Sequence, residues 1–495
     1  MPSVSLPNDA SLEQLRKLAK DLRDLAQAGV PGALDLVAEY HHQGAHPVSL
    51  TGAQLVIARH HGFPSWARLK QHLEMIERYR RSPDEVERAD DVADEFLLYA
   101  CLRHGGDDSP QRWERAAWLL ATHPGLVSTS IHVAAAAADE PAIRAHLAAD
   151  PALATRLGGP YGWEPLLYLT FARHNPHISE EAALGSAGAL LEHRADPNAG
   201  YLWHGMYPPY TAVTGALGSH ADDEHPHGFA LAELLLTAGA DANDSQTLYN
   251  RQFGDDNRHL VLLFAHGLGR GDGGPWAARF GAAADSPQEM LRSQLWWAIV
   301  HDMRERVKLL IEHGVDFLTP YSAPGGQPMA LRNSDGYTPA EIAALSGHPE
   351  LAAWLVSQGA GPPALDGVDS LIAAVLAGDR DAAMRLRAHA PAARNRRPGL
   401  MVWAASSRKL DAIPLLAELG FDVNALGRAD IPVEQPWFTP LHEAASTGDV
   451  DMATLLLRLG ADPNIKSEWG ATPLSAARRD GSVAVAELLE PLTHA

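Results

Sequence analysis

The sequence has almost no cysteine and no long apolar run. Its 495 residues include a single cysteine, Cys101, which excludes an internal disulfide and a zinc framework of several cysteines. No stretch of about 18 consecutive apolar residues occurs, and the first ten residues lack the basic and apolar regions of a signal peptide. We therefore expect a soluble, cytoplasmic protein that does not enter a membrane.

Basic residues are also scarce, and they are unevenly distributed. The chain has 40 Lys+Arg against 61 Asp+Glu, a formal net charge of −21. Residues 1–81 carry 10 Lys+Arg and 8 Asp+Glu, whereas residues 82–495 carry 30 and 53, so the two parts have net charges of +2 and −23. An acidic body repels phosphate backbones and attracts cations, which argues against nucleic acid and favours a basic or amphipathic protein partner.

Motifs of catalysis are missing as well. The chain has neither a G-x-S-x-G nucleophile elbow nor the lysine motif of a phosphate-binding loop. Cys101 follows the apolar segment 96–100, which predicts a buried, inert thiol rather than a nucleophile. We expect no catalytic residue and no cofactor, and we lean towards a protein that is not an enzyme.

Histidine, by contrast, is abundant, with 25 copies. The densest group of nitrogen and oxygen ligands is His220, Asp222, Asp223, Glu224, His225 and His227. This group lacks the i, i+4 spacing that places two histidines on one helix face, so a solvated acidic loop explains it better than a metal site. The sequence predicts no metal.

A motif near the C-terminus recurs with a fixed period. The segment Thr439-Pro440-Leu441-His442-Glu443-Ala444-Ala445 returns 33 residues later as Thr472-Pro473-Leu474-Ser475-Ala476-Ala477, with a Leu-rich segment and Gly460-Ala461-Asp462-Pro463-Asn464 between them. Period and motif resemble the ankyrin repeat, a pair of helices followed by a finger-like turn. More degenerate copies extend upstream. The resemblance implies an all-α ankyrin-repeat solenoid of about nine or ten units over residues 95–495.

The local chemistry of each repeat agrees with that fold. Thr before Pro suits a helix N-cap, because proline at the first helical position loses no hydrogen bond there. Pairs of leucine on the second helix form an apolar stripe against the neighbouring unit. Gly460 fits a left-handed residue after the helix.

Residues 1–81 do not follow the repeat and predict a separate helical module, joined by a linker over residues 82–94. Ser11 and Gln14 can cap a helix whose apolar face is formed by Leu12, Leu15, Leu18, Leu22 and Leu25, and further helices are expected over 31–41, 51–60 and 65–79. The module resembles helical segments that precede the repeats of bacterial ankyrin proteins. Residues 50–75 also scan as a helix-turn-helix that could turn Arg68, Lys70 and Gln71 towards DNA. A capping or docking role fits the weak charge better.

Several finger turns are enlarged and rich in aromatic residues, notably 198–211, 316–338 and 424–439. In ankyrin repeats the fingers and first helices share one concave surface, so such insertions mark a candidate binding face. Tyr249, Asn250 and Arg251 replace the usual residues of a first helix and are expected on the same face. The candidate binding residues are Trp163, Tyr168, Trp203, His204, Tyr207, Tyr210, Tyr249, Asn250, Arg251, Trp297 (or its neighbour Trp296), Trp403, Trp437 and His442. Filling of the core is the alternative for many of these aromatic residues.

These observations leave three functional hypotheses. The first is a non-catalytic scaffold that binds a protein partner through the concave face and the enlarged fingers. The second is a small-molecule-binding protein or enzyme that uses an aromatic and polar groove around residues 203–210 and 249–251. The third is a DNA-binding regulator that acts through residues 50–75.

Overall fold

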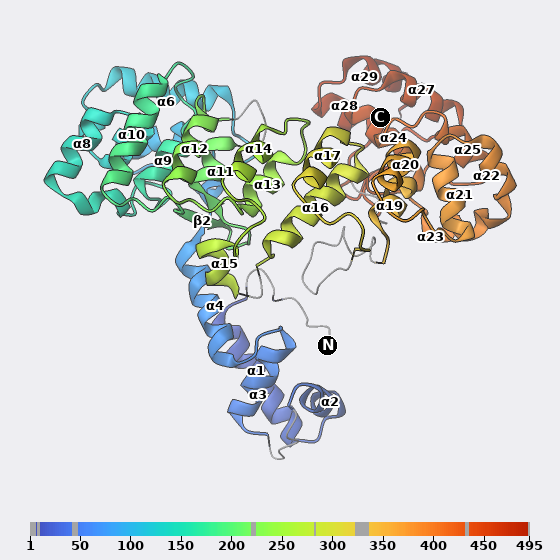
Figure 1. Cartoon of the computed structure of the whole chain (residues 1–495), viewed down its shortest axis with the longest axis horizontal. Coiled ribbons are helices and arrows are strands. Elements are labelled where there is room, and N and C mark those ends of the chain that lie inside the picture. Colours follow the sequence, from blue (N-terminus) through green and yellow to red (C-terminus); the bar gives the residue numbers. More distant parts are fainter. Residues whose placement is uncertain are drawn as a thin grey trace. The chain divides into compact units, whose positions relative to one another are not determined.

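The computed structural model describes residues 6, 10–41, 48–218, 224–281, 284–321, 336–430 and 435–493. The chain divides into two compact units, residues 1–290 and 291–495, which are described separately below. Both units are built mainly from short helices that follow one another in pairs (Figure 1). The predicted all-α fold is confirmed.

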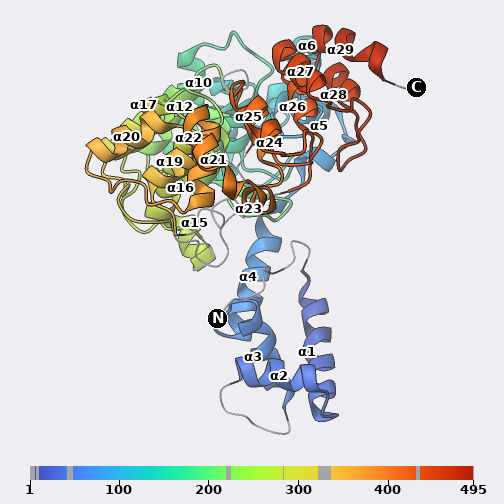
Figure 2. The same ribbon diagram turned by 90° about the vertical axis from the view of Figure 1, so that its right-hand side faces the viewer.

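The first unit begins with four helices. They are α1 (Leu12–Gln27), α2 (Pro31–Tyr40), α3 (Leu50–His60) and α4 (Trp66–Tyr79). Ser11, Ser49 and Ser65 cap α1, α3 and α4 by accepting hydrogen bonds from backbone N–H groups of the first turn, and Gln14 completes a capping box at α1. Helix α1 lies beside α3, as the turned view in Figure 2 shows.

The apolar face of α1 differs from the predicted one. Its buried residues are Leu15, Ala19, Leu22 and Ala26, which join the core shared by the four helices. Leu18 and Leu25 are exposed, so their assignment to this face was wrong. The physical reason is that Ala19 and Ala26, together with Leu15 and Leu22, lie where α1 meets its neighbours, and the small alanines permit close approach.

The helix pairs of the first unit follow. Their helices are α5 (Val92–Ala100), α6 (Pro110–Thr122), α7 (Ile131–Ala136), α8 (Glu140–Ala149), α9 (Pro165–Phe171), α10 (Glu180–Glu192), α11 (Ala212–Leu217), α12 (Gly228–Thr237), α13 (Ser245–Arg251), α14 (Arg258–Ala265) and α15 (Gly274–Phe280), with short 3₁₀ turns at Pro83–Glu85, Leu126–Ser128 and Pro151–Thr155.

Helix α16 (Pro287–Val300) leads into the second unit. The helices that follow are α17 (Arg304–Glu312), α19 (Pro339–Leu345), α20 (Pro349–Ser357), α21 (Gly367–Leu376), α22 (Arg380–Arg385), α23 (Ala390–Arg396), α24 (Leu400–Ser406), α25 (Ala412–Glu418), α26 (Pro440–Ser446), α27 (Val450–Arg458), α28 (Pro473–Arg479) and α29 (Val483–Leu489), with 3₁₀ turns at Arg387–His389 and Glu490–Leu492.

The repeat motif forms the local structure that the sequence predicts. Thr338, Thr439 and Thr472 each cap a first helix with a complete capping box, and proline follows at the first helical position. Gly460 adopts a left-handed conformation with φ of 94° after α27. These features depend only on neighbouring residues, which is why the sequence reveals them.

Asparagines in the finger turns connect successive helix pairs. Asn198 accepts a hydrogen bond from the backbone N–H of Asp241 at 2.9 Å and donates one to the carbonyl of Gly239 at 3.0 Å. Asn424 makes the same two bonds to the N–H of Asp462 at 2.8 Å and the carbonyl of Gly460 at 3.3 Å. Each amide therefore satisfies two backbone groups of the next pair.

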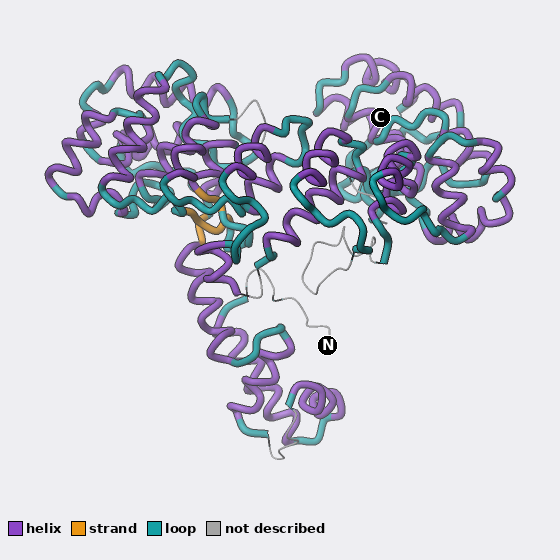
Figure 3. Tube along the Cα trace, viewed as in Figure 1, coloured by secondary structure: helices purple, strands orange, loops and turns teal. Residues whose placement is uncertain are grey.

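One small sheet of three strands interrupts the helices of the first unit. Strand β1 (Arg80–Arg81) runs parallel to β2 (Gly200–Trp203), and β2 is antiparallel to β3 (Tyr210–Thr211). Figure 3 shows these strands beside the end of α4. The segment that follows α4, which the sequence suggests is a linker, is thus attached to the finger at 198–211. The boundaries at residues 81 and 95 and the number of repeats stay predictions.

Candidate functional site

The finger at 198–211 packs against α4 and the segment that follows it. Leu202, Trp276 and Phe280 form a buried apolar cluster, and Met75, Ile76 and Tyr79 of α4 pack against it together with Tyr207. The rings of Tyr79 and Trp276 lie 4.9 Å apart, and those of Tyr207 and Phe280 lie 4.7 Å apart. Tyr207 is thus largely occupied by contacts within the chain.

His204 is engaged in the same way. Its backbone N–H donates to the carbonyl of Arg81 at 2.8 Å, and its Nδ1 lies 3.1 Å from the hydroxyl of Ser82. Its Nε2 lies 2.9 Å from a carboxylate oxygen of Asp84. The adjacent Trp203 is partly buried against the His204 ring at 4.3 Å. These contacts hold the segment after α4 rather than a ligand.

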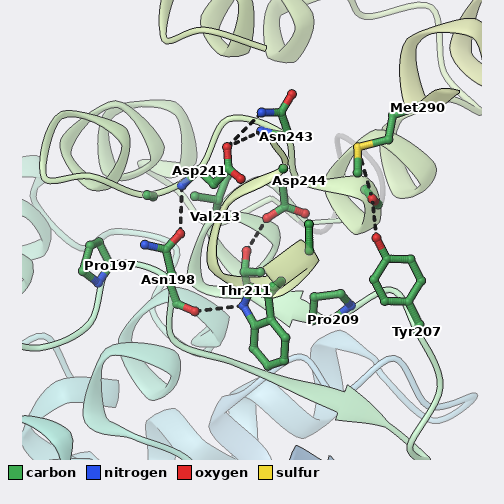
Figure 4. A pocket seen from close by; sticks show the side chains of 15 residues that line it. Pro197, Asn198, Tyr207, Pro209, Thr211, Val213, Asp241, Asn243, Asp244 and Met290 are labelled. Carbon is green, nitrogen blue, oxygen red and sulfur yellow. Dashed lines mark hydrogen bonds between the residues drawn. The ribbon is translucent and has the colours of Figure 1, made fainter. Parts of the chain in front are cut away.

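Behind this finger lies a small cavity of about 20 Å³, which has room for one water molecule (Figure 4). Asp244 caps α13 and accepts hydrogen bonds from the hydroxyls of Thr211 and Thr214. Burial raises the pKa of Asp244, although these hydrogen bonds oppose the rise. The hydroxyl of Tyr207 lies 3.3 Å from that of Ser245. The polar groups here serve the packing of the finger.

The candidate residues Trp163, Tyr168, Trp297 and Trp403 lie in the interior. Trp163 contacts the rings of Tyr168 and Tyr201 at 5.3 and 5.0 Å, and the hydroxyl of Tyr168 donates to the carbonyl of Gly158 at 2.9 Å. In the second unit Trp297 stacks on His301 at 4.0 Å, and Trp403 is 2 % exposed. The structure thus places these four side chains where they fill the core, and the proposal below uses none of them as a partner contact.

The three candidate residues of α13 differ in their exposure to solvent. Asn250 and Arg251 are buried, and Arg251 pairs with Glu224 at 3.0 Å and Asp256 at 2.8 Å. Tyr249 is 54 % exposed, with the ring of Phe253 at 5.3 Å. A helix turns successive residues to different faces, so Tyr249 alone of the three presents its ring to solvent.

Tyr210 and His442 have clear structural contacts. Tyr210 stacks on Tyr201 at 5.5 Å and lies 4.7 Å from the ring of His104. His442 is fully buried; its Nδ1 accepts from the backbone of Thr439, and its Nε2 donates to the carbonyl of Ala471 at 2.8 Å. That bond joins two successive repeats.

At the last fingers the structure brings together an aromatic patch, formed by Trp437, Phe438 and Trp469. The ring of Trp469 lies 5.4 Å from Trp437 and 5.0 Å from Phe438, and it is 60 % exposed. The guanidinium of Arg428 lies over the ring of Trp437, 4.1 Å from its centroid. Trp469 was missed in the sequence, although its place in a finger turn beside Gly470 could have revealed it.

Acidic residues adjoin the aromatic patch. Arg428 also pairs with Asp430 at 2.5 Å, which connects the patch to a carboxylate. Burial raises the pKa of Glu443 on α26 to about 7, and the nearby charges of Asp430 and Asp480 add to the rise. Near pH 7 Glu443 is therefore only partly ionised, and a cation close to it would favour its charged form.

The remaining candidates are Cys101, the histidine-rich group and the polar residues of α4. Cys101 is buried, and burial raises the pKa of its thiol to about 12. Among the described residues no group of three or more His, Cys, Asp or Glu could hold a metal, while His220, Asp222 and Asp223 lie outside the described residues. On α4, Lys70 pairs with Glu74 at 3.3 Å, and Arg68 bonds to Gln71, so these three candidates for binding DNA contact residues of their own helix.

Stacked helix pairs, finger turns and ladders between repeats define an all-α ankyrin solenoid. Comparison with known families agrees: residues 437–468 match the ankyrin repeat, and residues 295–356 match ankyrin repeats in many copies. The chain therefore contains ankyrin repeats.

Three known proteins are similar to parts of this chain. The chain is 37% identical over 84 residues to a human 2-5A-dependent ribonuclease, which is 17% of this chain and 10% of that protein. It is 36% identical over 94 residues to the fruit-fly E3 ubiquitin-protein ligase Ufd4, or 18% of this chain and 3% of that protein. A mouse 2-5A-dependent ribonuclease is 44% identical over 63 residues, 12% of this chain and 8% of its own. The matches thus span a tenth or less of each relative, and all three are animal proteins.

No helix in the described ranges combines the length and the apolar character that crossing a bilayer requires.

Proposed function

We propose that this chain is a non-catalytic scaffold that binds a protein partner through the fingers and first helices of its ankyrin repeats. Such repeats imply a role in protein–protein interaction, and the aromatic patch at the last two fingers carries the proposal for this chain. A cytoplasmic location and a bacterial origin remain predictions from the sequence.

The aromatic patch has the composition of an interface centre. Exposed tryptophans at interfaces contribute more binding energy than most residues, because a large ring is desolvated at small entropic cost. Trp469 offers such a ring, and Trp437 supports it from the neighbouring finger at 5.4 Å. Arg428 over Trp437 shows that a cation fits against this surface.

The charges nearby favour a basic partner. Asp430 pairs with Arg428, which lies over Trp437, and its charge raises the pKa of Glu443. The chain as a whole has a net charge of −21. A lysine or arginine of the partner could stack on Trp469 and approach Glu443. Complementary fields would also speed the encounter and make it sensitive to salt.

Affinity purification from the source organism with matched baits tests this proposal. The baits are the wild type, Trp469→Ala and a control, Trp118→Ala. Trp118 on α6 is also half exposed and lies 4.4 Å from its own cation, Arg115. We expect a protein that the wild type and the control retain equally, and that Trp469→Ala retains about thirtyfold less tightly, the effect of about 2 kcal/mol.

Two further results would decide the partner's character. Glu443→Gln should weaken retention, and higher salt should weaken it further, if the partner is basic. A partner that Trp469→Ala retains as well as Trp118→Ala does would contradict the proposed surface. Retention that neither Glu443→Gln nor salt changes would contradict the basic partner but leave the scaffold role intact.

A further inference from the structure

The second unit contains a cavity of about 760 Å³ that is separate from the aromatic patch. It is lined by the turns that follow α16, α19 and α24, together with Ala429 and Asp430 of a finger. Its volume falls in the range of sites that hold small organic molecules. The turns come from residues about 100 apart in sequence, so the cavity exists only in the folded unit.

The carboxylates of this cavity already have partners. Both oxygens of Asp302 accept hydrogen bonds from Arg304, at 3.0 and 3.2 Å, and Glu350 accepts another from Arg304 at 2.8 Å. Both oxygens of Asp430 accept from Arg428, at 2.5 and 2.7 Å. Each of these acidic side chains thus already accepts hydrogen bonds from an arginine, and Asp302 and Glu350 share one.

Donors, by contrast, remain available. The ammonium of Lys409 donates one hydrogen bond, to the carbonyl of Gly347 at 2.8 Å, and within the described chain its other two N–H groups have no acceptor. Arg408 pairs through Nε with Asp449 at 2.8 Å, while its side chain is 68 % exposed. The indole N–H of Trp403, which also lines the cavity, is buried without an acceptor among the described residues.

The two histidines of the cavity already contact backbone carbonyls. His348 donates from Nε2 to the carbonyl of Val300 at 2.9 Å, and His301 has the carbonyls of Trp297 and Asp430 at 2.9 Å from its two nitrogens. Burial lowers the pKa of both imidazoles, although the carbonyls beside His301 and His348 oppose the fall. The unused polar groups are therefore donors, and two of them are cationic.

We propose that this cavity binds a small organic anion, through Lys409 and Arg408. The bound group is a carboxylate or a phosphate, since either accepts charge-assisted hydrogen bonds from an ammonium and a guanidinium. Its two cationic residues, Lys409 and Arg408, lie outside the aromatic patch, although Asp430 borders both sites.

Isothermal titration of the full chain with citrate and with inorganic phosphate tests the proposal and distinguishes the two anions. We expect saturable binding of one or both, in the wild type and in a control, Arg380→Gln. Arg380 is exposed and pairs with Glu418 outside the cavity. Lys409→Gln and Arg408→Gln should each weaken binding about tenfold or more, because each removes a charge-assisted hydrogen bond.

A second variant separates binding from folding. Arg408→Gln leaves the buried carboxylate of Asp449 without its partner, so a structural defect alone could weaken binding. Asp449→Asn breaks the same pair but retains Arg408, and the asparagine oxygen can still cap α27. We expect Asp449→Asn to bind the anion at least as tightly as the wild type. Equal loss in both variants, or no saturable binding of either anion to the wild type, would overturn the proposal.

Discussion

Acid should weaken the first unit through one buried histidine, His174. Its ring is fully buried against Phe96, at 5.0 Å, and neither ring nitrogen has a hydrogen-bond partner within the described chain. Burial lowers its pKa from 6.5 to about 4. An unpaired imidazole in the interior accepts a proton only at a high cost.

The sign of the effect follows from linkage. The unfolded chain binds the proton near pH 6.5 and the folded chain only near pH 4, so between these values the unfolded state binds more protons. His174 therefore does not lower the stability of the folded chain above pH 6.5, where it is neutral in both states. As the pH falls from 6.5 towards 4, the free energy of unfolding decreases. At 1.36 kcal/mol per pKa unit the total loss is about 3 kcal/mol, of which about 2 kcal/mol is lost by about pH 4.5.

The perturbation is His174→Leu, which removes the titrating group at similar volume. Urea unfolding at about pH 7 and about pH 4.5, read by hydrogen exchange of α9, measures the stability next to this site. We expect the fall in the free energy of unfolding to be about 2 kcal/mol smaller in the variant than in the wild type. His313→Leu, at an exposed histidine, is the control and should keep the wild-type fall. The same fall in all three proteins would refute the reasoning, whatever their stabilities at pH 7.

Three further predictions concern a carboxyl, a contact and a turn. Because burial raises the pKa of Glu443 from 4.5 to about 7, its ionisation destabilises the fold progressively as the pH rises from about 4.5 to about 7. Glu443→Gln should therefore stabilise the second unit by up to about 3 kcal/mol near pH 8 in thermal melts, and no gain over the value near pH 5 would contradict this. Asp84→Ala removes the partner of His204 and should make cleavage after α4 up to about fivefold faster in limited proteolysis, because a partly exposed pair contributes up to about 1 kcal/mol; unchanged cleavage would mean that β1 alone holds the segment. Gly347→Ala should lower the melting temperature more than Gly359→Ala, since both have positive φ but only at Gly347 would the new methyl meet a backbone carbonyl, at 2.6 Å; equal losses would show that conformation alone decides.

The sequence predicts those parts of the fold that depend on neighbours along the chain. Thr439, Pro440 and Gly460 form their cap, first turn and left-handed residue from local geometry, and recurrence of the motif implies stacking. The buried face of α1 is harder to predict from the sequence. Either Leu18 or Ala19 could face the core, and the shape of the neighbouring helices determines that Ala19 is buried.

Candidate sites are less predictable, because they join distant segments. Trp163 and Trp469 look alike in the sequence, yet one is 1 % and the other 60 % exposed, and a periodic pattern does not separate them. No pattern in the sequence identified Lys409 or Arg408 as candidate binding residues. Their environment is formed by turns near residues 301, 347 and 430, which only the folded unit brings together.

Enlarged fingers alone therefore do not identify a binding surface; what matters is whether the chain itself already covers them. The finger at 198–211 carries the densest aromatic set, but α4 and the segment after it occupy Leu202, His204 and Tyr207. The finger at 424–439 has fewer aromatic residues, and among the described residues Trp437 contacts Arg428 and the ring of Trp469, which is mostly exposed. The negative charge of the sequence favours the same surface, because Asp430 pairs with Arg428, which lies over Trp437. For these reasons we propose that a partner binds at the last repeats, whereas the finger at 198–211 holds α4 and the segment after it.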